Sequence, residues 1–170
     1  SKKLIFEESD LSSSQRSPLS FTLFSNGINS GVTFSGIPGG HEFNSFVLAI
    51  LQLGGADLKL DENVKSMIGT ISEKLDFEVF ISLDCHICPE VVQSLNKFAI
   101  VNENISCEMI DGGLFPDTVN DRDIQGVPTV FLNRKFFSSG KTEISKIISK
   151  LGDIIDTSKK SDEPEMEIQD

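Results

Sequence analysis

The chain has 170 residues, room for one ordinary domain or two small ones, and its 26 acidic against 15 basic residues leave a formal net charge of −11. That balance argues against a nucleic-acid binder, which needs basic side chains along the phosphates. No run approaches the roughly 20 apolar residues that span a bilayer, and no apolar segment typical of a signal peptide follows residues 1–4. We therefore expect a soluble cytoplasmic protein without a membrane or nucleic-acid partner.

The first third of the chain predicts strands. Alternating and clustered apolar residues favour strands over residues 3–8, 19–24 and 31–36, with a serine-rich loop over 11–17. The Asn26-Gly27 dipeptide is typical of a tight turn, so we expect it to join the second and third of these strands in a hairpin.

Two helices are expected next. The first begins after the glycine pair at residues 39–40, and its predicted buried stripe consists of Phe43, Phe46, Val47, Ile50 and Leu51. Asp61 is the expected N-cap of the second helix. The apolar face predicted for this second helix consists of Val64, Ile68, Ile71 and Leu75.

The second half predicts the order β-α-β-α-β-β-α. Its elements are a strand over 77–83, a helix from 88 to about 102, a strand over 105–110, a short polar helix or irregular turn over 114–124, strands over 129–132 and 135–138, and a last helix capped by Thr142 and ended by Gly152. The first parallel step must cross over in the right-handed sense. Residues 156–170 hold six acidic side chains and little to bury, so we expect a linker or a disordered tail.

Three cysteines are too few, and an odd number, for a disulfide scaffold, but two of them form a C-x-x-C pair where a strand runs into a helix. Cys85 would lie at the helix N-terminus, where free N–H groups and the helix dipole favour a thiolate. Cys88, one turn further on, could then attack a mixed disulfide. We therefore assign Cys85 as the nucleophile and Cys88 as the resolving thiol. His86 would support the Cys85 thiolate if it were charged, and otherwise it is only exposed.

A zinc site is the competing interpretation of the same pair. It would need two further ligands, and the candidates are His41, His86 and Cys107. These residues lack the spacing of a zinc knuckle, and Cys107 falls in the middle of a predicted strand. We therefore predict no metal, and we interpret Cys107 as a small buried apolar residue.

Val127-Pro128 comes directly before a strand that begins at Thr129. An ordinary trans proline is the default for such a loop. In the predicted strand order, however, this proline lies beside the helix that carries the thiols. A cis bond would turn the Val127 backbone toward them and offer strand-like hydrogen bonds to a bound peptide. We expect substrate contacts from His86, Val127, Pro128 and Thr129.

Four stretches together resemble one known family. They are FISLDCHICPEVVQSLN (80–96), IDGGLF (110–115), DRDIQGVPTVFLN (121–133) and GGHEFNSFVLAIL (39–51). The family is the N-terminal domain of the flavoprotein subunit of alkyl hydroperoxide reductase, and the resemblance extends to about Asp156. Ile87 departs from it, because asparagine is usual at that position.

The resemblance implies an α/β fold of two thioredoxin-like folds side by side in one continuous mixed sheet. The first, redox-inactive and apparently truncated, would cover residues 1–75 and the second, redox-active, residues 76–155, followed by the acidic segment 156–170. It also implies a thiol–disulfide oxidoreductase that passes electrons from a flavoprotein's disulfide centre to the disulfide of a peroxiredoxin, the second protein of the alkyl hydroperoxide reductase system. Since no G-x-G-x-x-G motif is present, FAD and NAD(P)H are expected only on a separate or missing domain.

The resemblance further implies a cis Pro128 and a buried Glu42 that exchanges a proton with the cysteine pair. From the sequence alone, we would instead interpret Glu42 as an acid in the first turn of a helix, where its charge interacts favourably with the helix dipole. Two other functions stay open: a general protein disulfide oxidoreductase similar to glutaredoxin, and a redox-inactive binding module.

Overall fold

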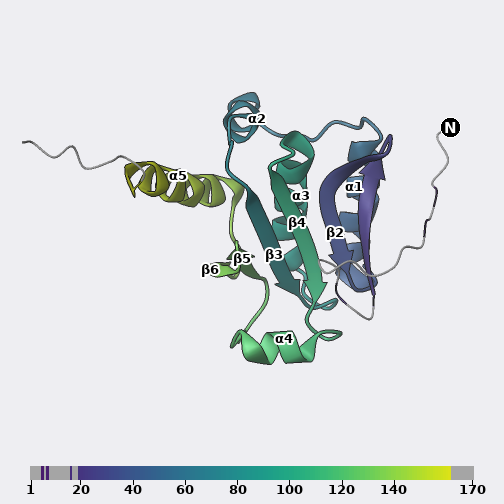
Figure 1. Cartoon of the computed structure of the whole chain (residues 1–170). Helices are drawn as coiled ribbons and strands as arrows, with labels where there is room; N and C mark the ends of the chain where they lie inside the picture. Colours follow the sequence, from purple (N-terminus) through teal and green to yellow (C-terminus); the bar gives the residue numbers. More distant parts are fainter. Residues whose placement is uncertain (1–4, 6, 8–15, 17–18, 162–170) are drawn as a thin grey trace, which may run out of the picture.

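The computed structural model describes residues 5, 7, 16 and 19–161, with side chains to residue 154. Six strands form one mixed sheet in the order β1-β2-β4-β3-β5-β6. Figure 1 shows β1 at one edge, the β5–β6 hairpin at the other, and α5 leading away to the C-terminus. Most of the strand predicted over 3–8 lies outside the described residues, and Ile5 and Glu7 are not in a strand.

The predicted hairpin is confirmed. β1 (Ser20–Ser25) pairs antiparallel with β2 (Ile28–Ser35), and Asn26 and Gly27 both have positive φ, at 53° and 78°. Two positive φ values match the twist of the flanking strands, and asparagine and glycine tolerate them best. β2 then pairs in parallel with β4, which joins the hairpin to the rest of the sheet.

The buried stripe predicted for the first helix is only partly right: Phe46 packs against the core, and Val47 and Ile50 are half-buried. After the short 3₁₀ turn η1 (Gly40–Glu42) comes α1 (Phe43–Leu53), which buries Ser45 and Ala49. Phe43 and Leu51 are instead 56% and 53% exposed. α1 packs against α3, and small side chains at such a contact allow the two helix backbones to approach closely.

The second helix is shorter than predicted. Asp61 caps α2 (Glu62–Gly69), accepting from the amide of Asn63 at 2.9 Å, as expected. The helix ends at Gly69, however, so Leu75 belongs to the following strand and not to the apolar face of α2. The amide of Leu75 donates to the carbonyl of Asn104, which starts the ladder to the next strand.

The second half follows the predicted order. Its elements are β3 (Leu75–Ile81), α3 (Cys88–Val101), β4 (Ile105–Asp111), α4 (Pro116–Asp121), β5 (Thr129–Leu132), β6 (Lys135–Ser139) and α5 (Ile144–Ser161). β3 and β4 are parallel, and β5 is antiparallel to β3. α5 runs past Gly152, which corrects the predicted end and makes residues 156–161 helical rather than disordered. One glycine inside a helix costs only about 1 kcal/mol, and buried Ile147 and Leu151 anchor this helix.

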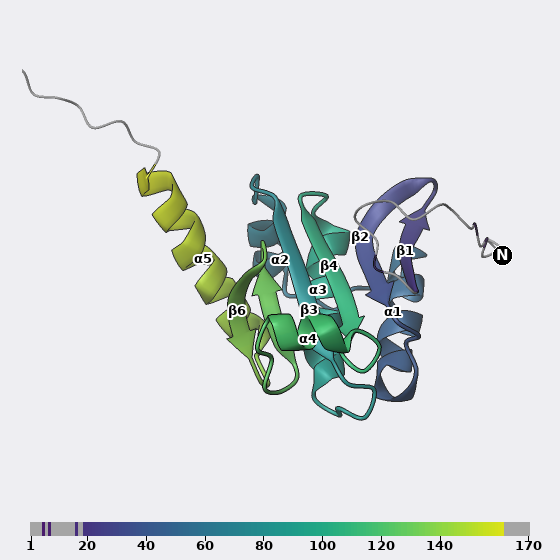
Figure 2. The same ribbon diagram turned by 60° about the horizontal axis from the view of Figure 1, so that its bottom comes forward.

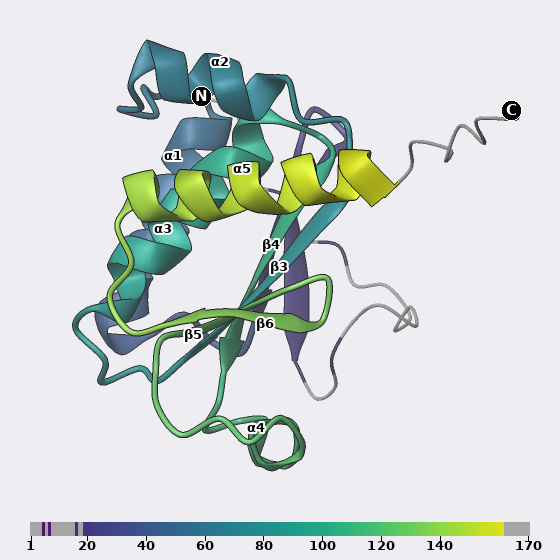
Figure 3. The same ribbon diagram turned by 90° about the vertical axis from the view of Figure 1, so that its left-hand side faces the viewer.

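Helices cover the two faces of the sheet unequally. Figure 2 shows α4 in front of the strands and α1 and α3 behind them, and Figure 3 shows α5 on the same side as α3. The main core lies under α3, whereas α4 covers a small cluster formed by Phe80, Ile110, Phe115 and Phe131. No helix in the described part of the chain has both the length and the apolarity to cross a bilayer.

A charged network crosses the α4 side of the sheet. Glu78 of β3 accepts from both Arg122, at 2.6 and 2.9 Å, and Arg16, and Arg16 also binds Glu108 of β4 at 2.8 Å. The Arg122 guanidinium lies 4.8 Å from the centroid of the Phe131 ring. Each glutamate is thus paired, as charges largely removed from water must be.

Candidate active site

The two cysteines lie at the carboxyl ends of the parallel strands. β3 ends at Ile81, a short loop carries half-buried Cys85, and α3 begins at fully buried Cys88 with Pro89 in its first turn. A disulfide joins Cys85 to Cys88, with S–S 2.14 Å and Cα–Cα 5.5 Å. The described residues contain no group of three or more His, Cys, Asp or Glu side chains that could hold a metal ion.

The N-terminus of α3 is directed at Cys85. The backbone amide of Cys88 donates to Cys85 Sγ at 3.2 Å. In the reduced protein, this donor and the positive end of the helix dipole favour the Cys85 thiolate over the thiol. Cys85 is the more accessible of the two sulfurs, so the geometry fits its assignment as the attacking residue.

The Val127–Pro128 peptide bond is cis, as the resemblance implied. It brings the Val127 carbonyl oxygen to 4.0 Å from Cys85 Sγ. Pro128 is buried, and its own carbonyl is used by the amide of Gly140. The loop thus places one backbone oxygen beside the half-buried Cys85 sulfur.

His86 and Thr129, also expected to contact substrate, differ in solvent exposure. His86 is exposed next to Cys85. Thr129 is buried, and its hydroxyl donates to the carbonyl of Gly126 at 2.6 Å within its own loop. Its side chain therefore supports the loop that holds Val127.

Glu42 is completely buried, and neither of its carboxyl oxygens has a hydrogen-bond partner at normal distance among the described residues. Burial raises its pKa from 4.5 to about 7, because a charge without water is unfavourable, and the Ser45 hydroxyl opposes this rise. An acid that titrates near neutral pH can both give and take a proton under ordinary conditions.

A backbone contact attaches the Glu42 turn to the cysteine loop. The amide of His41 donates to the carbonyl oxygen of Leu83 at 3.1 Å. The preceding Gly40 has a φ of +52°, and a Cβ at this position would lie 2.5 Å from the same Leu83 oxygen. Only glycine therefore lets η1 approach the loop that carries Cys85 this closely.

Cys107 is buried in β4, as expected for a small apolar residue. Burial raises the pKa of its thiol well above the ordinary value, and the charges of Glu108 and Glu42 act in the same direction. It is therefore held as a neutral thiol.

Ser45 and Gln93 form a contact that the sequence does not predict. Gln93 of α3 donates from Nε2 to Ser45 Oγ of α1 at 3.2 Å. The helical pattern suggests an outward-facing glutamine and a solvent-facing serine. No local signal could reveal this bond, since it joins two helices far apart in the sequence.

Comparison with known proteins agrees with this geometry. Residues 75–152 match the thioredoxin domain family. The chain is 44% identical over 165 residues to the alkyl hydroperoxide reductase AhpF of Staphylococcus aureus, covering 92% of this chain and 32% of that protein. The chain is thus similar to a part of that protein. It is also 42% identical over 168 residues to a Bacillus subtilis protein named NADH dehydrogenase, covering 99% of this chain and 32% of the relative.

A solved structure supports the same relationship. Enterococcus faecalis AhpF superposes with a TM-score of 0.76 at 34% identity, covering 80% of this chain and 65% of that one. The thioredoxin-like α/β fold predicted from the sequence is therefore confirmed. The chain spans about a third of the length of the curated relatives it matches.

Proposed function

We propose that this chain is a dithiol–disulfide electron carrier in peroxide reduction. It would take electrons from the disulfide centre of a flavoprotein and pass them to the disulfide of the peroxiredoxin of the alkyl hydroperoxide reductase system. The observation that carries the proposal is the accessible Cys85 sulfur, bonded to buried Cys88 and facing the first amide of α3. The homology to AhpF supports this reaction and its partners.

The chain is reduced in two exchange steps. A thiolate of the donor attacks Cys85 Sγ, which forms a mixed disulfide and breaks the Cys85–Cys88 bond. The electron pair of that bond leaves on Cys88 Sγ, which takes a proton from the Glu42 carboxyl group. The second donor thiolate then attacks the donor sulfur of the mixed disulfide, closing the donor's disulfide and releasing Cys85 as a thiolate.

The chain is oxidised by the acceptor disulfide through two similar exchange steps. The Cys85 thiolate attacks the acceptor disulfide, giving a mixed disulfide and one acceptor thiolate. The Glu42 carboxylate takes the proton of the Cys88 thiol, and the resulting Cys88 thiolate attacks Cys85 Sγ. The Cys85–Cys88 disulfide re-forms as the second acceptor thiolate leaves.

The remaining parts of the site would bind the partner polypeptide. The Val127 carbonyl is placed to accept a backbone hydrogen bond from a segment lying over Cys85, with Pro128 and Thr129 holding the loop and exposed His86 at its rim. FAD and NAD(P)H would bind outside this chain. We further propose a redox-inactive unit over 1–75, a redox-active unit over 76–155 and an acidic segment over 156–170.

Direct electron transfer tests the proposal. The reduced chain is mixed anaerobically with oxidised peroxiredoxin, and free thiols are counted on each protein by mass spectrometry after alkylation. We expect one acceptor disulfide reduced for each Cys85–Cys88 pair oxidised, and no transfer from a Cys85→Ser variant. Reduction of small disulfides without reduction of the peroxiredoxin would favour a general protein disulfide oxidoreductase. Equal activity of the Cys85→Ser variant in peroxide reduction would favour a binding module.

A further inference from the structure

A hydrogen bond from Gln93 Nε2 to Ser45 Oγ joins α3 to the first turn of α1. Ser45 follows Glu42 by three residues, so both side chains lie on the same side of the first turn of α1. Ser45 is 1% exposed, and Gln93 is half-buried. A buried hydroxyl is therefore held between a glutamine that reaches solvent and an acid that does not.

The direction of the Ser45 hydroxyl follows from its bonding capacity. A serine hydroxyl has one proton to donate and two lone pairs, and the Gln93 amide nitrogen can only donate. The bond at 3.2 Å thus occupies a lone pair of Ser45 Oγ and leaves its proton for another acceptor.

A helical serine often gives its proton to a carbonyl one turn back, as Ser94 does to Glu90 at 2.7 Å. In the described part of the chain, no backbone carbonyl accepts the Ser45 proton. The Glu42 carboxyl group is the acceptor that remains within the same turn; it makes no hydrogen bond of normal geometry, and the Ser45 hydroxyl lowers its pKa.

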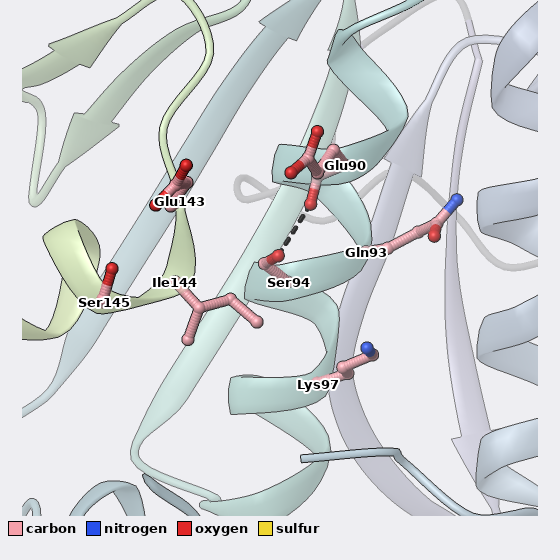
Figure 4. A pocket seen from close by; sticks show the side chains of 7 residues that line it. All are labelled: Glu90, Gln93, Ser94, Lys97, Glu143, Ile144 and Ser145. Carbon is pink, nitrogen blue, oxygen red and sulfur yellow. Dashed lines mark hydrogen bonds between the residues drawn. The ribbon is translucent and has the colours of Figure 1, made fainter. Parts of the chain in front are cut away.

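Gln93 also lines a surface cavity of about 400 Å³ between α3 and the start of α5. Figure 4 shows its side chain extending away from Glu143 and Ser145, which line the opposite wall. Because Gln93 is only half-buried and borders a surface cavity, it can be changed without opening the core around Glu42.

We propose that Gln93 and Ser45 are positioning residues for Glu42, with the Gln93 amide directing the Ser45 hydroxyl proton onto the Glu42 carboxylate. This inference rests on the proposed role of Glu42 in thiol exchange. A hydroxyl proton turned toward this carboxylate would stabilise the charged form of an acid that burial otherwise keeps neutral. Glu42 can then act as a base for Cys88 as well as an acid.

The charges of the other titratable groups around Glu42 must stay constant in any test. Cys107 of β4 is within electrostatic range of Glu42, and it stays a neutral thiol. Cys85 and Cys88 are bonded to each other in the oxidised protein. His41 neighbours Glu42 on η1 but is exposed. The test therefore uses the oxidised chain, in which Cys85 and Cys88 do not titrate and the Glu42 carboxyl group is followed directly.

The test is a titration of the Glu42 carboxyl carbon by ¹³C NMR, with Glu42→Gln to assign the signal. We expect a midpoint near 7 in the parent chain, an upward shift of about one pH unit in Ser45→Ala, and a smaller upward shift in Gln93→Met. Ser94→Ala is the matched control, since its hydroxyl binds Glu90, and the midpoint should not move. An unchanged midpoint in Gln93→Met or in Ser45→Ala would overturn the proposal.

Electron transfer to the peroxiredoxin by the same variants separates this inference from the proposed function. A shifted midpoint supports the positioning role even if the parent chain fails to reduce the peroxiredoxin, which would refute the proposed function alone. If the parent chain is active, we expect the pH dependence of its oxidation rate to move upward in Ser45→Ala and Gln93→Met. A pH profile that stays in place while the NMR midpoint moves would overturn the link between the two.

Discussion

The backbone amide of His41 donates a hydrogen bond to the carbonyl oxygen of Leu83 at 3.1 Å, across 42 positions of sequence. This bond joins the turn that carries Glu42 to the loop that carries Cys85. It therefore attaches a turn from the first half of the chain to the disulfide loop of the second half.

Gly40→Ala should destabilise the chain and disturb the site. A Cβ at this position would lie 2.5 Å from the Leu83 oxygen, and the φ of +52° disfavours any L side chain. We expect a loss of at least about 2 kcal/mol in the free energy of unfolding, measured by urea denaturation. Gly69→Ala is the control, because nothing lies within 4 Å of its Cβ and alanine favours a helix. Equal stability of the two variants would show that the close approach is unimportant.

Glu42 should make the chain less stable as the pH rises. Its folded pKa is raised from 4.5 to about 7, so the folded state holds the proton more tightly than the unfolded state. The contribution of Glu42 to the free energy of unfolding is therefore fully present below pH 4.5. It is lost between pH 4.5 and 7, by up to about 3 kcal/mol. Glu42→Gln should remove this part of the pH dependence in urea titrations at pH 5 and 8. The same slope in both proteins would contradict the raised pKa.

The two active-site cysteines should behave differently when one is removed. In Cys88→Ser, Cys85 keeps its half-exposed sulfur but has no resolving partner, so mixing with oxidised glutathione should give a stable adduct. In Cys85→Ser, the fully buried Cys88 should react much more slowly. Intact-mass spectrometry measures both adducts. Cys107→Ser added to each variant is the control and should leave both rates unchanged, and faster labelling of Cys88 would reverse the assignment.

Arg122→Ala should destabilise the sheet through the charged network on its α4 side. The change leaves largely buried Glu78 with Arg16 alone and removes the guanidinium from the Phe131 ring. We expect a loss of about 2–4 kcal/mol in the free energy of unfolding. Lys65→Ala, which breaks an exposed pair with Glu62 at 3.9 Å, should change it by less than about 0.5 kcal/mol. If both variants changed the free energy of unfolding by a similarly small amount, the Arg122–Glu78 pair would not stabilise the fold.

Local patterns in the sequence predicted much of the fold. The Asn26-Gly27 hairpin and the Asp61 cap are each decided by a few neighbouring residues, and both are present. The cysteine pair could also be placed from sequence, since a strand followed by C-x-x-C and a helix puts the first thiol at the helix N-terminus. The resemblance to the flavoprotein family added the cis Pro128 and the burial of Glu42, which no spacing in the sequence reveals.

Only the tertiary structure decided which side of α1 is buried and how the site is supported. The spacing in α1 groups Phe43 with Leu51, but contact with α3 buries Ser45 and Ala49 instead. The bond from Gln93 to Ser45 spans 48 positions, so no local pattern encodes it. Helical periodicity determines which residues share a face, whereas the packing of distant segments determines which face meets a neighbour and which acid loses its water.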